Sequence, residues 1–190
     1  MEVRALADAP ARPVRVIDPD TGLVAAARAQ PREFLALYDK YFDRVLGYVR
    51  IRISDPATCE DVTSQVFTTA LERLDRFRGH GSFAGWLFQI ARNAARDVHR
   101  RRTPEQLDGE RPAGDPSPEE QVLRRERTAE LQALVRHLRP EQQHLLALRY
   151  GAGLSYEQIG AMLDTAPATV RVRMHRILEE LRRRYSHDDA

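Results

Sequence analysis

Apolar side chains recur every three or four positions along most of the chain from residue 31 onward, the period that predicts amphipathic α-helices. One pattern runs from residue 31 to about residue 53. A second runs to about residue 76 from the Asp55-Pro56 pair, which suits an N-cap followed by a first-turn proline. Ser82 caps a third, whose predicted inner face is Phe83, Trp86, Leu87, Ile90, Ala94 and Val98. No stretch shows the alternation typical of a β-strand.

The segment TPEQLDGERPAGDPSP, residues 103–118, interrupts this helical pattern. It contains four prolines, two glycines and four acidic residues, and Leu107 is its only large apolar side chain. Such a composition predicts a linker, and helical patterns return after it. The expected fold is therefore all-α, with a three-helix domain at residues 31–102 and a four-helix domain at residues 119–185 joined by a flexible linker.

The two ends of the chain lack a sustained period. We expect residues 1–30 to form a disordered N-terminal tail and residues 186–190 to form a short C-terminal tail. The residues that break any helical pattern near the N-terminus are Pro10, Pro13, Pro19 and Gly22.

The stretch LSYEQIGAMLDTAPATVRVRMHRI, residues 154–177, has the spacing of a helix-turn-helix. Ser155 and Gln158 form a capping box, Asp164 lies where the chain must turn, and Pro167 opens the second helix. Gly160 is small enough for another helix to cross closely. The expected buried stripe of the second helix is Val170, Met174, Ile177 and Leu181. Its expected exposed face includes Thr169, Arg171, Val172, Arg173, His175 and Arg176.

This exposed face suits DNA recognition, because one helix fits the major groove and arginines bond guanine edges or phosphates. The alternative is an antiparallel helix pair with a solvated arginine face. A second basic face is expected on the helix after Ser82, opposite its apolar stripe. A turn with Phe77, Arg78, His80 and Phe83 precedes that helix and is placed to hold an unstacked base; the alternative puts Phe77, Phe83 and Trp86 in the core. The basic and polar residues of this face are Arg92, Asn93, Arg96, His99 and Arg100.

Several motifs together resemble bacterial RNA polymerase sigma factors of the extracytoplasmic-function (ECF) class. The stretch from residue 154 to 177 resembles their segment that binds the promoter −35 element. FRGHGSFAGWLFQIARNAARDVHRRR resembles their −10-reading segment, CEDVTSQVF their polymerase-docking segment, and FLALYDKYFDRVLGYVR their first conserved helix. The resemblance covers about residues 31–102 and 121–185.

The resemblance implies a protein that binds core RNA polymerase, directs it to −10 and −35 promoter elements and assists melting. By resemblance, the docking face is Asp61, Ser64, Gln65 and Thr68, and the −10 contacts are Phe77, Arg78, His80, Asn93, Arg96 and Arg100. An anti-sigma factor is a further implied partner, and the linker of this family threads into the polymerase active-site channel.

Four positions named here depart from the family pattern. Ser64-Gln65 replace a usual Gln-Glu pair, which suggests a differently balanced dock. Asp164 replaces a common turn glycine. Val172 replaces a common serine on the reading face, which leaves the −35 preference open.

Composition narrows the remaining classes. The net charge is only +2, so a nucleic-acid surface must arise from uneven charge placement. No apolar run approaches the roughly 20 residues of a membrane helix, and the N-terminus lacks a secretory signal, so we expect a cytoplasmic protein without membrane insertion. A single cysteine, Cys59, excludes an internal disulfide. With no phosphate loop and no metal-ligand spacing among the histidines, we expect neither an enzyme nor a cofactor.

Two other functions stay open at this stage. One is a helix-turn-helix regulator that acts without polymerase, although CEDVTSQVF argues for a polymerase dock. The other is a sigma-like decoy that occupies an anti-sigma partner, which the changed Ser64-Gln65 pair keeps in play.

Overall fold

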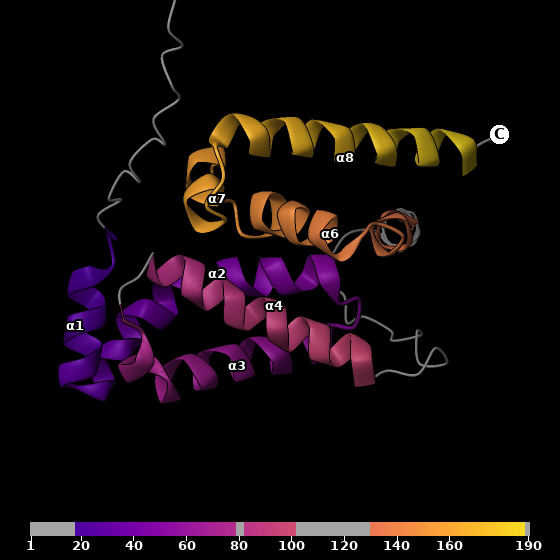
Figure 1. Ribbon diagram of the computed structural model, residues 1–190. Helices are drawn as coiled ribbons and strands as arrows, with labels where there is room; N and C mark the ends of the chain where they lie inside the picture. The colour runs from indigo at the N-terminus through magenta and orange to yellow at the C-terminus, as the bar shows by residue number, and fades with distance from the viewer. Residues whose placement is uncertain (1–17, 79–81, 102–129, 189–190) are drawn as a thin grey trace, which may run out of the picture.

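A computed structural model describes residues 18–78, 82–101 and 130–188 of the chain (Figure 1). Its regular elements in these ranges are all helical, which confirms the all-α prediction. The α-helices are α1 (Thr21–Ala29), α2 (Phe34–Arg52), α3 (Pro56–Glu72), α4 (Phe83–Arg101), α6 (Pro140–Leu146), α7 (Tyr156–Met162) and α8 (Pro167–Asp188). Shorter turns are the 3-10 helices Pro31–Glu33 and Leu74–Arg76 and the π-helical turn Ala147–Gly151.

Helices α2, α3 and α4 pack together at the predicted positions in the N-terminal half. Asp55 caps α3 by accepting a hydrogen bond from the Thr58 amide at 2.8 Å. The predicted inner face of α4 was partly wrong, because α4 packs against both α2 and α3 and so buries a wider sector than one stripe. Trp86, Ile90 and other predicted members are only half-buried. The fully buried side chains of α4 are Phe83, Leu87, Phe88, Ala91 and Ala95.

Helix α1 corrects the prediction that residues 1–30 are a disordered tail, because it lies inside that segment and packs against α2. Val24 and Ala27 belong to the hydrophobic core, and the Asp20 carboxylate is fully buried. Tyr41 and Lys40 on α2 donate hydrogen bonds to that carboxylate. Pro19 and Gly22 stand at the start of the helix, where they do not interrupt it. Residues 1–17 lie outside the described residues.

Helices α6, α7 and α8 form the C-terminal half, and α7 and α8 are the predicted helix-turn-helix. Ser155 accepts a hydrogen bond from the Gln158 amide at 3.2 Å, and the Gln158 side chain accepts one from the Ser155 amide at 2.9 Å, which confirms the capping box. Asp164 has a φ of 48°, the left-handed conformation expected at the turn. Gly160 is a close approach as predicted, but a Cβ there would meet Thr165 O of the turn at 2.6 Å, rather than another helix.

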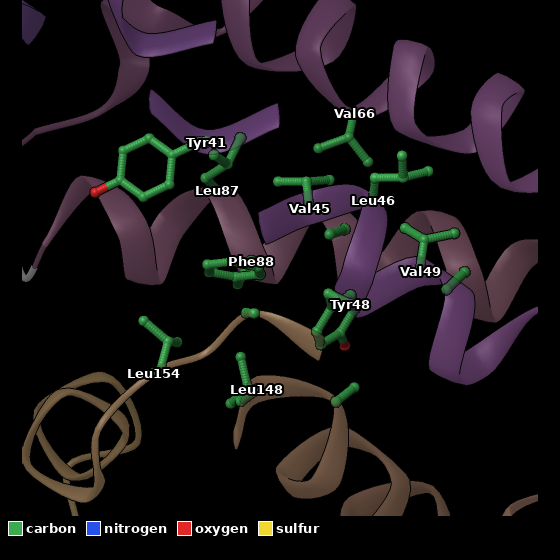
Figure 2. Packing of buried hydrophobic residues seen from close by; sticks show 14 of the residues in the cluster. Tyr41, Val45, Leu46, Tyr48, Val49, Val66, Leu87, Phe88, Leu148 and Leu154 are labelled. Carbon is green, nitrogen blue, oxygen red and sulfur yellow. The ribbon is translucent and has the colours of Figure 1, made fainter. Parts of the chain in front are cut away.

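The two halves pack against each other through α2 and the π-helical turn. A Cβ on Gly47 would lie 2.3 Å from Gly151 O, so the two backbones touch directly. Beside them, Tyr48 OH and His144 Nδ1 form a buried hydrogen bond of 2.7 Å. Leu148 and Leu154 lie next to Tyr48 and Phe88, so one apolar core extends across both halves (Figure 2). We call this surface the interdomain contact, and define it by Gly47, Tyr48, His144, Leu148 and Gly151.

The predicted linker, residues 103–118, lies outside the described residues, as does most of the helix expected at residues 119–137. Residues 130–136 of that helix are described and are helical. Among the described residues, none of the helices combines the length and apolar character needed to cross a membrane.

Candidate nucleic-acid and partner interfaces

Helix α8 has one closed face and one open face. Its inner face is in the core, with Val170 and Met174 each 1% exposed and Ile177 3% exposed. Helix α8 lies on the side of the C-terminal half that is farthest from α2 and α3, and its first turn is next to α7 (Figure 1). The predicted reading residues are all exposed there: Thr169, Arg171, Val172, Arg173, His175 and Arg176. The sequence therefore predicted this arrangement correctly, with an apolar Val172 set among the basic side chains.

One aromatic residue, Tyr156, and one basic residue, Arg149, lie next to this face and were not among the predicted site residues. The Arg171 guanidinium lies 5.5 Å from the centre of the Tyr156 ring, and the Arg149 guanidinium lies 5.0 Å from the same ring. Arg149 is held in place by a hydrogen bond of 3.1 Å from its guanidinium to Leu154 O. Tyr156 is the first residue of α7, directly after the cap at Ser155, and no local pattern signals that its ring lies beside Arg171 of α8.

The Glu157 carboxyl also reports on this corner. Its backbone hydrogen bond and the Ser155 hydroxyl hold its pKa below the ordinary value, and Arg171 and Arg149 add to that effect. The ionised carboxylate suits the first turn of α7, where the helix dipole favours negative charge. Arg171 and Arg149 therefore act on the Glu157 carboxylate of the protein itself, while other basic side chains of α8 remain available to a bound anion.

The second predicted DNA face lies on α4. Asn93, Arg96 and Arg100 are exposed as predicted, and Arg100 pairs with Asp97 at 3.5 Å. Arg92, on the same predicted face, is half-buried, and its charge adds to the burial that lowers the pKa of His144. Asn93 lines a groove of about 240 Å³ between α3 and α4, with Gln65 on the α3 side.

The structure corrects the prediction that Phe77 contacts DNA. Its side chain is 6% exposed and packs against Phe83 and Trp86, with ring centres 6.0 Å and 5.3 Å away. The core alternative therefore holds for Phe77, because the chain turns there and the three aromatic rings close the end of the N-terminal half. Arg78 is exposed as expected. His80 lies outside the described residues.

The predicted docking face on α3 is a continuous polar strip. Asp61, Ser64, Gln65 and Thr68 are all exposed, and the Thr68 hydroxyl donates a hydrogen bond to Ser64 O at 3.0 Å. Cys59 lies on the opposite side, 1% exposed, with its thiol donating to Ile53 O at 3.3 Å. Because it is buried, this side chain acts as a small residue of the core.

A buried histidine lies in the interdomain contact. Burial is the main cause that lowers the His144 pKa to about 3, with Arg92 and Arg52 adding to the effect, so the ring is neutral at physiological pH. The Tyr48 hydroxyl pairs with its Nδ1. Among the described residues no cluster of three metal-ligating side chains occurs, and His144 is explained by its tyrosine partner.

Family models match both halves of the chain. Residues 37–105 match sigma-70 region 2, and residues 128–181 match sigma-70 region 4. These two regions define a sigma-70-type factor, with the basic face of α4 and the polar strip of α3 in region 2 and the helix-turn-helix in region 4.

Individual relatives place it more closely. The chain is 33% identical over 183 residues to the ECF RNA polymerase sigma factor BldN of Streptomyces coelicolor, which covers 90% of this chain and 69% of that protein. It is 32% identical over 167 residues to the RNA polymerase sigma-H factor of Pseudomonas aeruginosa, covering 81% of this chain and 86% of that protein. It is 35% identical to the ECF sigma factor SigE of Mycolicibacterium smegmatis, over 77% of this chain and 59% of SigE. The chain belongs to the ECF family of RNA polymerase sigma factors.

Solved structures agree on the fold. The structure of CnrH in complex with the cytosolic domain of CnrY has a TM-score of 0.68 and 23% identity, covering 90% of this chain and 99% of CnrH. The sigma factor RpoE of Bartonella quintana, solved with the anti-sigma factor NepR, has a TM-score of 0.56 and 20% identity, covering 80% and 96%.

Proposed function

We propose that this sigma factor reads the −35 element with α8, holds the −10 strand with α4, and docks on core polymerase through α3. The observation that carries this assignment is the presence of two basic, exposed helical faces on different halves of one chain, beside a separate acidic and polar strip. A regulator that acts without polymerase needs only the first of these faces. Promoter recognition, strand opening and polymerase binding each require a surface of their own, and the chain has three.

The reading role of α8 rests on its charge and its shape. Arg171, Arg173 and Arg176 lie in the N-terminal half of the helix, the part that a helix-turn-helix presents to base edges. Bidentate bonds from arginine to guanine are the commonest specific contacts in the major groove. Val172, 51% exposed, suits an apolar contact with a thymine methyl group. Thr169 and His175 are placed to contact the backbone or flanking bases.

The opening role of α4 rests on a similar argument for single strands. Arg78, Arg96 and Arg100 supply positive charge for a phosphate backbone, and Asn93 supplies both a donor and an acceptor for a base edge. The half-buried Trp86 and the buried Phe77 serve as the apolar support of this surface.

The chain must open at the interdomain contact to use both DNA faces on one promoter. Elements centred near −10 and −35 are about 25 base pairs apart, or roughly 85 Å along the helix axis. A compact chain of this length has a radius of gyration of only about 16 Å. With α2 against the π-helical turn, the two halves cannot reach both elements, so binding of polymerase and promoter must separate them.

The remaining roles follow from this assignment. The protein acts in the cytoplasm, where polymerase and chromosome lie, and it works by binding without catalysis or a cofactor. An anti-sigma factor is a further partner. Its support is that a sigma factor of like fold, RpoE of Bartonella quintana, was solved with the anti-sigma factor NepR.

Run-off transcription with core polymerase tests the proposal. The wild-type protein with core polymerase is expected to give a specific transcript from a promoter selected from its own genome. Asp61→Arg is expected to abolish co-purification with core polymerase and the transcript, because it reverses the only charge among the four residues of the proposed docking face. Asp39→Arg, an equal change of charge at an exposed site on α2, is the control.

The outcomes separate the candidate functions. No transcript from wild-type protein that still binds an anti-sigma factor would identify a decoy. Specific DNA binding without polymerase co-purification would identify a regulator. If Asp61→Arg still co-purifies with polymerase, the polymerase-binding surface lies elsewhere on the protein.

A further inference from the structure

Residues 18–29 contact both flanks of the turn between α3 and α4. This segment precedes both regions matched by the family models, which begin at residues 37 and 128. It includes Asp18, the buried Asp20 and helix α1, and we call it the brace. Its contacts with residues 74–77 on one flank and with Phe83 on the other bring together parts of the chain about 50 to 65 positions apart.

On the downstream flank, the brace caps helix α4. Asp18 Oδ2 accepts a hydrogen bond from the Phe83 amide at 2.8 Å, and Phe83 is the first residue of α4. Ser82 Oγ accepts from the Gly85 amide at 3.1 Å. The first amides of a helix have no partner within it, and a carboxylate there also complements the helix dipole. The position of the first turn of α4 therefore depends on a residue of the brace.

On the upstream flank, Arg28 grips the backbone just before Arg78. Its Nε and a terminal nitrogen donate to Leu74 O at 3.3 Å and 3.1 Å, and the same terminal nitrogen donates to Phe77 O. The guanidinium also lies 6.0 Å from the centre of the Phe77 ring. These bonds fix the end of the 3-10 helix and the direction in which Arg78 leaves it.

The brace is itself anchored to α2. The Asp20 carboxylate is 0% exposed and accepts hydrogen bonds from Tyr41 and Lys40. Tyr41 also packs against Phe83, with ring centres 5.7 Å apart. The brace is thus a rigid connection from the central helix to both flanks of the turn.

We propose that Asp18 and Arg28 are positioning residues for promoter opening, which hold Arg78 and the start of α4 in the geometry that captures the −10 strand. The proposal rests on the assignment of α4 and Arg78 to strand opening. Capturing an unpaired strand costs less when the capturing groups are already fixed, because their conformational entropy is lost during folding instead of during binding. The brace supplies that order from outside the DNA-facing surface.

The test compares a duplex promoter with the same promoter mismatched across the −10 region. Asp18→Ala and Arg28→Ala are each expected to lower permanganate reactivity of −10 thymines and run-off transcription on the duplex by about tenfold, because each removes hydrogen bonds to backbone. On the mismatched template, where strands are already separated, the loss is expected to be about twofold or less. A residue needed only for folding would lower activity equally on both templates.

Two further variants serve as matched controls. Asp18→Asn keeps an oxygen that can accept a hydrogen bond from the Phe83 amide, and it is expected to open promoters nearly as well as the wild type. Arg32→Ala removes a nearby arginine that is 78% exposed and paired with Glu33 at 3.4 Å, and it is expected to open promoters like the wild type. Arg28 lies on the exposed side of α1, so Arg28→Ala tests the proposal even if Asp18→Ala does not fold.

Normal opening by Arg28→Ala, or equal losses on the two templates, would overturn the proposal. Asn93→Ala/Arg96→Ala runs in parallel to separate this result from a failure of the proposed function. If that double variant opens promoters normally, the α4 assignment fails. If it is defective while Arg28→Ala is normal, the α4 assignment stands and only the brace proposal fails.

Discussion

Replacing Gly47 by alanine is expected to separate the two halves of the protein while leaving each half folded. The new Cβ would lie 2.3 Å from Gly151 O and 3.1 Å from Gly151 C, both of them backbone atoms. Within the two halves, α2 is packed against α3 and α4, and the π-helical turn is packed against α6, so neither backbone is free to shift. Relief therefore comes from moving the two halves apart. Inside α2 the change is favourable, because alanine is preferred over glycine in a helix by about 1 kcal/mol.

The size of the effect follows from the steric overlap that the new Cβ creates in the closed state. Separation breaks the Tyr48–His144 hydrogen bond and the bond from Arg44 Nε to Ala152 O, which measures 3.1 Å. Each contributes about 1 kcal/mol, and overpacking typically costs 1–3 kcal/mol. The two bonds favour the closed state in the wild type and in the variant alike, so only the overpacking changes the balance. It is expected to cost the closed state about 1–3 kcal/mol relative to the open one, a shift of roughly 5- to 150-fold.

Small-angle X-ray scattering measures this directly. The Gly47→Ala protein is expected to have a larger radius of gyration than the wild type and an unchanged far-UV circular dichroism spectrum. Gly22→Ala is the matched control, because a Cβ at Gly22 meets nothing within 4 Å. A Gly47→Ala protein as compact as the wild type would refute the reasoning that backbone contact at this glycine holds the halves together.

Two further predictions concern the buried histidine and the reading helix. Burial, with Arg92 and Arg52, lowers the His144 pKa to about 3, so the closed state binds no proton there above pH 5. In the open state the ring is expected to have the ordinary histidine pKa of about 6.5 and to take up a proton as the pH falls. The closed state is therefore expected to lose about 2 kcal/mol relative to the open state between pH 8 and pH 5. Scattering against pH measures this, and a His144→Gln protein that opens with the same pH dependence would exclude His144 as the cause. Alanine at Arg171, Arg173 and Arg176 together is expected to remove −35 protection, at about 1–3 kcal/mol per lost base contact, and to flatten the salt dependence while polymerase still co-purifies. Undiminished −35 protection at moderate salt would assign these arginines to solvated surface.

The sequence predicted those parts of the fold whose causes are local. The cap at Asp55, the capping box at Ser155 and the proline at position 167 each act within one turn of a helix, so α3, α7 and α8 begin where expected. The reading face of α8 followed from one amphipathic helix with a single buried stripe.

The parts that the sequence did not predict depend on contacts between distant residues. Helix α1 has few local signals, and its buried Asp20 is tolerated only because Tyr41 and Lys40 lie beside it in the fold. Phe77 was placed at a DNA surface because its neighbours are basic, whereas its ring closes a cluster with Trp86. The π-helical turn Ala147–Gly151 meets Gly47 about a hundred positions earlier in the chain, a contact that no local pattern signals.

The interdomain contact also sets how strongly the protein competes for polymerase. If only the open chain engages polymerase and both promoter elements, its apparent affinity is the intrinsic affinity multiplied by the fraction of open molecules. For each 1.4 kcal/mol of closing free energy, the open fraction of the free protein and its apparent affinity fall about tenfold. The close contact between Gly47 and Gly151 would then raise the concentration that the protein must reach before it displaces other sigma factors from the polymerase.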